Sequence, residues 1–114
     1  MGDEKDILSS LTSELNRGTL VLGVLSQMKQ PKYGYSLVQS LTDQGIETDP
    51  NTLYPLLRRL EKQGLLLSQW ETSGSKPRKY YQLTLQGEQI YLALREQWIH
   101  LSEGMHRLLK EEES

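Results

Sequence analysis

The sequence predicts a mainly α-helical fold that contains one small β-hairpin. The first observation is the segment 51–64, where leucines recur at helical spacing and a glycine follows them. The second is a pair of strand patterns at 65–71 and 79–83, joined by a loop rich in Gly, Ser and Pro. The third is the helical spacing of apolar residues near both ends of the chain. A helix followed directly by a hairpin predicts a winged helix-turn-helix, here with a long C-terminal helix after it.

The first third of the chain predicts helices on either side of Pro31. The apolar residues at helical spacing before it are Ile7, Leu8, Leu11, Leu15, Leu20, Val21, Val24, Leu25 and Met28. We expect one bent helix or two short ones ending near Gln30, because a proline disfavours helical geometry in the residue before it. A further helix should begin at residues 33–36 and stop at Gly45. Its inward-facing residues are Leu37, Val38 and Leu41.

Residues 49–52, Asp-Pro-Asn-Thr, carry several signals of a helix start, since Asp and Asn cap helices and proline suits the first helical position. A proline inside a helix costs about 3 kcal/mol. We therefore expect the helix to begin at Asn51 or Thr52, which places Pro55 at the edge of the first turn. Gly64 should end this helix. Steps of three and four assign Leu53, Leu56, Leu57 and Leu60 to the buried face, and Asn51, Tyr54, Pro55, Arg58 and Lys62 to the opposite face.

The loop of the predicted hairpin is basic. Lys76, Arg78 and Lys79 surround Pro77, an arrangement that suits contact with phosphates or with the minor groove. The alternative interpretation is a solvated turn whose charges prevent edge-to-edge aggregation.

The strands of the hairpin carry aromatic residues. Tyr80 and Tyr81 alternate along the second strand, so one should point inward and the other outward. We expect Trp70, on the first strand, to pack in the core at the base of the wing.

Thr84 is the predicted N-cap of a last helix that runs to about Glu112. Apolar residues on this helix step alternately by three and four, the pattern of one helix packing along another. These residues are Tyr91, Leu94, Trp98, Leu101, Met105 and Leu108. With no linker or repeat in the chain, residues 1–84 form the winged unit and residues 85–114 the C-terminal helix of the same structural unit.

Charge is unevenly distributed along the 114 residues. Residues 17–80 hold nine Lys or Arg and five Asp or Glu, a balance of +4, whereas the two ends hold four and ten, a balance of −6. The whole chain therefore has a net charge of −2, but its centre suits contact with phosphates. The chain lacks cysteine, an apolar run of membrane length and a signal-peptide pattern, so we expect a cytoplasmic protein that does not enter the membrane.

The sequence offers little to catalysis or to metal binding. Ser, Asp and His occur without the order of a catalytic triad or a nucleophile elbow, and no Gly-rich phosphate loop is present. His100 and His106 are six residues apart, which puts them on different faces of a helix, and Glu103 does not complete a site. We expect no enzyme activity, no cofactor and no metal.

Several motifs in a fixed order carry a resemblance to a known family. They are Tyr33-Gly34-Tyr35, the run Thr52-Leu-Tyr-Pro-Leu-Leu-Arg-Arg-Leu-Glu61, Gly64-Leu65, Trp70-Glu71, and Arg78-Lys79-Tyr80-Tyr81-x-Leu83-Thr84-x-x-Gly87. Over residues 20–87 the chain resembles the PadR family of bacterial transcriptional regulators, and its single short C-terminal helix is similar to the smaller subfamily. The family position before Thr52 is often Gly, and here it is Asn51.

The resemblance implies a winged helix-turn-helix homodimer that binds double-stranded DNA, usually represses transcription and is often released by a small molecule. Asn51, Thr52, Tyr54, Pro55 and Arg58 would enter the major groove, Lys32, Tyr33 and Tyr35 would touch phosphates, and Lys76, Arg78 and Lys79 would hold the flanking backbone. The first and last helices would build the dimer through Leu8, Leu11, Leu15, Tyr91, Leu94, Trp98, Leu101, Met105 and Leu108.

Two questions stay open at the level of sequence. Trp98 suits core or dimer packing, but it is also a candidate contact for a flat aromatic ligand, and Met105 beside it would suit an adaptable pocket. The alternative function is a protein-interaction adaptor that keeps the winged scaffold without binding DNA, which the acidic ends would allow.

Overall fold

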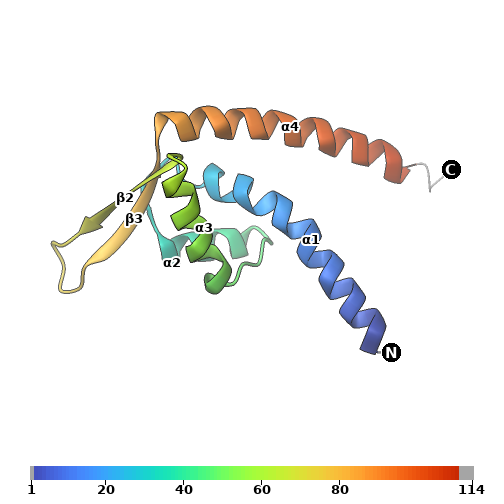
Figure 1. Ribbon diagram of the computed structural model, residues 1–114, viewed down its shortest axis with the longest axis horizontal. Helices are drawn as coiled ribbons and strands as arrows, with labels where there is room; N and C mark the ends of the chain where they lie inside the picture. The colour runs from blue at the N-terminus through green and yellow to red at the C-terminus, as the bar shows by residue number, and fades with distance from the viewer. Residues whose placement is uncertain (1, 111–114) are drawn as a thin grey trace.

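The computed structural model describes residues 2–110 of the chain. Along the sequence lie α1 (Gly2–Ser26), β1 (Lys32–Tyr33), α2 (Gly34–Asp43), α3 (Pro50–Lys62), β2 (Leu66–Glu71), β3 (Arg78–Leu83) and α4 (Leu85–Lys110). Figure 1 shows α1 and α4 leaving the centre of the molecule on the side opposite to the β2–β3 hairpin. The mainly helical fold with a wing and a long C-terminal helix is the one that the sequence predicts.

Helix α1 is a single helix that continues through Gly18 and ends at Ser26, four residues before the predicted end near Gln30. The chain leaves the helix after Ser26, and Met28 lies in the segment between α1 and β1. Its carbonyl oxygen accepts a hydrogen bond of 2.9 Å from the backbone N–H of Leu83, at the end of β3. The segment that follows α1 therefore lies against the end of β3, the strand that precedes α4.

Helix α2 begins and ends where the sequence predicts, and Gly45 follows it with a φ of 85°, a conformation that favours glycine. Helix α3 begins at Pro50, so the expected start at Asn51 or Thr52 was wrong. The Asp49 side chain accepts a hydrogen bond of 2.9 Å from the Asn51 N–H and caps the helix one residue earlier. Pro55 consequently lies inside α3. Its missing N–H leaves the carbonyl of an exposed residue without a helical partner, where water can replace it.

The sheet has three antiparallel strands in the order β1-β3-β2. The two-residue strand β1 was not predicted from the sequence, because two residues are too few to show an alternation of polar and apolar side chains. Tyr81 is buried and Tyr80 half-buried, which confirms that these neighbours face opposite sides. Trp70 is 62% exposed, so its predicted place in the core at the base of the wing was wrong. It lies four residues beyond the buried Leu66, about 13 Å farther along β2, where it lines an open groove between α3 and the hairpin.

The core lies where α1, α2 and α3 meet the base of the sheet. The predicted leucines of α3 are all in it, which confirms the stripe that the sequence indicates. Among the described residues, the buried hydrophobic side chains are Val24, Leu25, Met28, Leu37, Leu41, Leu53, Leu56, Leu57, Leu60, Leu65, Leu66, Tyr81 and Tyr91.

Helix α4 is capped by Thr84, as predicted. The Thr84 hydroxyl accepts a 2.9 Å hydrogen bond from the Gly87 N–H and donates a 2.6 Å bond to the carbonyl of Gly64. One hydroxyl thus ties the end of the α3 segment to the start of α4. The predicted end of this helix near Glu112 lies outside the described residues. Within the part that is described, no helix is long and apolar enough to cross a membrane.

Candidate nucleic-acid interface

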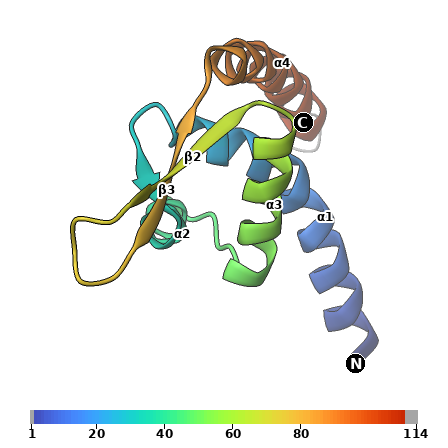
Figure 2. The ribbon, with the colours of Figure 1, turned by 60° about the vertical axis from the view of Figure 1, so that its left-hand side comes forward.

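A groove of about 490 Å³ lies between α3 and the hairpin. Helix α3 contributes Tyr54 and Arg58, and the strands contribute Trp70, Lys79 and Tyr81. Figure 2 shows the hairpin extending away from α1 and α4, with α2 and α3 beside its base. The exposed face of α3 and the wing are therefore available together on one side of the molecule.

The five α3 residues predicted to enter the major groove are all exposed: Asn51, Thr52, Tyr54, Pro55 and Arg58. Tyr54 is held by its neighbour on α2, since a Cβ atom at Gly34 would come within 2.5 Å of the Tyr54 ring. A glycine at this position lets the ring lie against the start of α2. The sequence motif alone gave no reason for this glycine, because the two residues are 20 positions apart.

Arg58 lies near the hydroxyl of Tyr81, on the strand that faces α3. Burial raises the pKa of Tyr81, the Glu61 carboxylate raises it further, and the positive charge of Arg58 opposes both effects. Arg58 itself forms no ion pair among residues 2–110. Its guanidinium group therefore retains its donors for an external acceptor.

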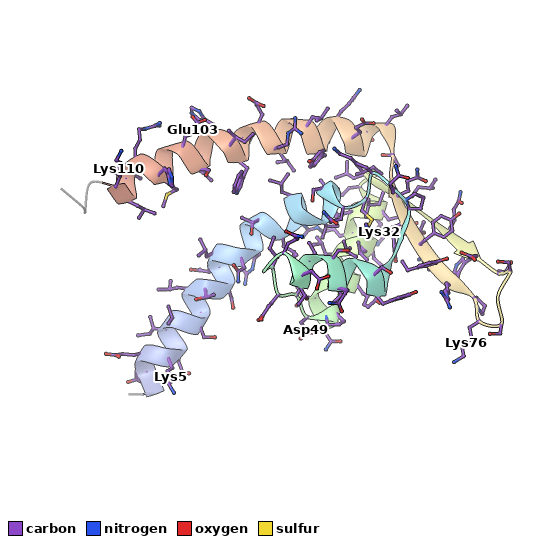
Figure 3. All side chains as sticks on the ribbon, turned by 180° about the vertical axis from the view of Figure 1, so that it is seen from behind. Lys5, Lys32, Asp49, Lys76, Glu103 and Lys110 are labelled. Atoms are coloured by element: carbon purple, nitrogen blue, oxygen red, sulfur yellow. The ribbon has the colours of Figure 1, made fainter. Side chains whose placement is uncertain are left out.

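The wing cations differ in their surroundings. Lys76 is exposed at the tip of the hairpin, and Figure 3 shows it far from Glu103 and Lys110 on α4. Lys79 is instead 4.0 Å from Glu61 of α3, with side chains 33% and 34% exposed. Its ammonium also lies 5.9 Å from the centre of the Trp70 ring and 5.6 Å from that of Tyr81. Part of the charge of Lys79 is therefore compensated within the chain.

Tyrosines and Arg78 form a cluster where the wing leaves the sheet. Tyr33 and Tyr35 stack with ring centres 5.7 Å apart, and the guanidinium carbon of Arg78 lies 5.5 Å from the centre of the Tyr33 ring. Arg78 donates a hydrogen bond of 3.4 Å to the Tyr35 hydroxyl. The Tyr33 hydroxyl donates to Glu71, so it already has a partner inside the chain. Three of the predicted phosphate-binding residues therefore contact one another.

Hydrogen bonding holds the Glu71 carboxylate in its ionised form. The Tyr33 hydroxyl, and then the Ser73 hydroxyl, lower the pKa of Glu71. The same bond to Glu71 is the main reason that the pKa of Tyr33 is raised. Sequence reasoning missed Glu61 and Glu71 as parts of this surface, because it treated acidic residues only as a sum of charge. Position 71 faces Arg78 in the strand register, which is the signal that could have found it.

The predicted dimer residues lie on the other side of the molecule. Leu8, Leu11 and Leu15 are exposed on α1, and Trp98, Leu101, Met105 and Leu108 are exposed on α4. Leu94 packs partly against the core. Tyr91 is only 7% exposed, so it is mainly a core residue of its own chain and leaves little surface for a partner.

A second hollow, of about 380 Å³, opens between α1 and α4. Trp98 and Arg95 line it from α4, opposite Leu22 and Ser26 of α1. Most of its lining is apolar, with the Arg95 guanidinium 5.7 Å from the centre of the Tyr91 ring. Among residues 2–110 no group of His, Cys, Asp and Glu is arranged to hold a metal ion.

Comparisons with known proteins agree with this geometry. A crystal structure of a PadR family regulator from Eggerthella lenta is 53% identical, has a TM-score of 0.86, and matches 96% of this chain and 97% of its own. A transcriptional regulator of Mycobacterium tuberculosis is 35% identical over 75 residues, which are 65% of this chain and 70% of that protein. Bacillus subtilis PadR, solved in complex with operator DNA, shares the fold at 23% identity, with a TM-score of 0.62 over 67% of this chain and 45% of its own.

The family model that matches the chain covers residues 21–93, from near the end of α1 into α4. It includes the groove, the wing and the cap of the last helix. Because it spans more than half of the sequence, this chain belongs to the PadR-like family of transcriptional regulators.

Proposed function

We propose that this protein is a homodimeric repressor that binds a palindromic operator through α3 and the wing. The observation that carries the proposal is that Arg58 and two of the wing cations, Arg78 and Lys79, line one exposed groove. The matching family is one of transcriptional regulators and not of enzymes, which agrees with the expectation from the sequence that the protein has no enzyme activity. The complex of a relative of the same fold with operator DNA supports the same mode of action.

In this proposal α3 enters the major groove. Arg58 has the fork of donors that pairs with the two acceptors of a guanine edge, and Asn51 and Thr52 lie in the first turn of the helix, which enters the groove first. Lys76 and Arg78 bind phosphates beside the groove, together with Tyr35 and Lys32 at the start of the preceding helix. Phosphate contacts fix the position of the protein, and base contacts select the sequence.

Dimerisation would follow from the exposed apolar side chains of α1 and α4. Leu15 is 74% exposed and Leu101 is 65% exposed, although the apolar residues of both helices recur at the spacing of a helix that packs against a neighbour. A second copy could cover these faces and place two copies of α3 about one helical turn of DNA apart, roughly 34 Å. The domain division at residue 84 then separates the DNA-binding unit from the dimerisation helix.

A small aromatic effector could act at the hollow lined by Trp98. A ligand there would contact both α1 and α4, the two helices assigned to the dimer. If it bound better to a dimer whose α3 spacing no longer fits the operator, it would release the DNA. The shift is limited by the difference between the ligand's affinities for the two states.

The test is fluorescence anisotropy with the full chain and the DNA upstream of its own gene, with salt and unlabelled random DNA as variables. Tight binding that survives the competitor and weakens steeply with salt is the expected result. Binding no tighter than to random DNA would show that the operator does not lie upstream of this protein's own gene. Genome-wide capture would then separate a distant operator from the adaptor alternative, which predicts no enriched DNA at all.

A further inference from the structure

We propose that Glu71 and Tyr33 form a latch that sets the position of the wing and of Arg78, and that Glu71 strengthens DNA binding despite its negative charge. The proposal rests on the proposed function, because it assigns a positioning role to two residues of that DNA-binding surface. Neither side chain needs to touch DNA for this role.

The latch spans the sheet from one edge to the other. Glu71 ends β2 and is paired with Arg78 of β3, while Tyr33 belongs to β1 on the far side of β3. Strand β1 pairs with β3 only at Tyr80 and Tyr81, so the hairpin beyond this point has no third strand. The hydrogen bond from Tyr33 to Glu71 crosses β3 where that support ends. It therefore ties the projecting hairpin to the residues that open α2.

Arg78 lies within this frame. Its guanidinium carbon is 5.5 Å from the centre of the Tyr33 ring and one of its nitrogens donates to the Tyr35 hydroxyl. Tyr33 is fixed on one side by stacking on Tyr35 and on another by an edge contact to Tyr80, with ring centres 6.2 Å apart. Arg78 remains exposed, and its other donors can bind a phosphate. An arginine held in place loses less conformational entropy when it binds than a free one does.

Simple electrostatics predicts the opposite effect for Glu71. A carboxylate beside a DNA backbone repels phosphates, so removing it should strengthen binding and should do so equally for any neutral replacement. The latch predicts weaker binding when the hydrogen bond is lost, and recovery when a neutral group still accepts that bond. The two interpretations therefore differ in the sign of the change and in the response to glutamine.

The experiment measures the affinity of the full chain for a random-sequence duplex at low salt, and for its operator once that is known. Backbone contacts do not depend on sequence, so the random duplex reports on the phosphate contacts, those of the wing included. The variants are Glu71→Ala, Glu71→Gln, Tyr33→Phe and the double variant Glu71→Ala/Tyr33→Phe. Glu103→Ala, on exposed α4, is the control for losing one negative charge elsewhere. Thermal unfolding of each variant is measured alongside.

We expect Glu71→Ala and Tyr33→Phe each to weaken binding about threefold to tenfold, the range for releasing one or two long side chains. Glu71→Gln should stay within about twofold of the parent protein, because its amide oxygen can accept the same bond. The loss of affinity in the double variant should be no larger than the larger of the two single losses, as expected for two residues that act through one contact. Tyr33→Phe should leave the salt slope unchanged, since no phosphate contact is lost.

Tighter or unchanged binding by Glu71→Ala would overturn the latch, as would additive losses in the double variant. If Glu71→Ala is poorly folded, Tyr33→Phe decides, because it keeps the stacked ring and removes only the hydroxyl. A parent protein that binds no duplex at low salt would instead refute the proposed function. The two failures are therefore distinguishable.

Discussion

Arg58→Ala is the substitution that tests the placement of α3 most directly. Arg58 is exposed, lines the groove opposite the wing and forms no ion pair within residues 2–110. Removing it should therefore change the free energy of unfolding by no more than about 0.5 kcal/mol. Any larger effect on DNA binding then belongs to the contact with DNA.

The size of that effect depends on which DNA group Arg58 meets. A bidentate contact with a guanine contributes about 1–3 kcal/mol of discrimination, so affinity for the operator should fall roughly 5-fold to 150-fold. Affinity for random DNA should fall much less. A phosphate contact would instead lower both affinities alike and reduce the salt slope by about 0.9.

Arg59→Ala is the matched control, because Arg59 is the next residue of α3, is also exposed and has the same charge. On a helix it points about 100° away from Arg58 and does not line the groove. Anisotropy titrations of both variants, with operator and random duplexes at several salt concentrations, separate the cases. Equal losses from the two variants, or an unchanged operator affinity for Arg58→Ala, would refute the placement of this helix.

Three further predictions concern the wing, the core and the dimer. Lys76→Ala should reduce the salt slope of DNA binding by about 0.9, whereas Lys79→Ala should reduce it by less, because Lys79 is already paired with Glu61 within the chain. Equal reductions of the salt slope by the two variants would contradict this difference. Gly87→Ala should lower the free energy of unfolding by about 2 kcal/mol and Tm by on the order of 10 °C, because the added Cβ would overlap the backbone carbonyl of Leu65. Gly104→Ala on the same helix is the control and should be neutral or stabilising in the same thermal unfolding measurement. Trp98→Asp should produce monomers in sedimentation experiments, since a charge buried in the proposed interface has no partner; a stable dimer would remove Trp98 from that interface.

Much of the fold was predictable because its determinants are local. The leucine spacing of α3, the left-handed Gly45 and the capping hydroxyl of Thr84 all act within a few residues, so the sequence displays them directly. The error at the start of α3 came from weighing Pro55 above Asp49, whose side chain caps a helix that begins at Pro50. The exposed Trp70 shows that strand alternation assigns a face but does not reveal how far the helices cover the sheet.

The site was predictable in outline, from basic residues near a helix and a hairpin, but its internal contacts were not. Tyr33 and Glu71 are 38 residues apart, and Lys79 and Glu61 come from different elements. Such pairs depend on how the elements are arranged in space, and the two-residue strand β1 that completes the sheet has no recognisable pattern in the sequence. Charge counting could therefore locate the basic region without indicating which cations are free.

Those contacts also explain how a chain with a net charge of −2 can present a face to DNA. Of the carboxylates in the basic centre, Glu61 accepts a hydrogen bond from Ser68 and lies beside Lys79, while Glu71 accepts from Tyr33. The charges of these two carboxylates are thus directed at groups of this chain, and both carboxylates also hold a residue of the groove or the wing in place. Lys29, by contrast, lies over the ring of Tyr91 on α4, so its charge does not add to that of the wing. The number of phosphates that each chain neutralises should consequently be smaller than the nine cations of residues 17–80, and the salt slope of the parent protein measures that number directly.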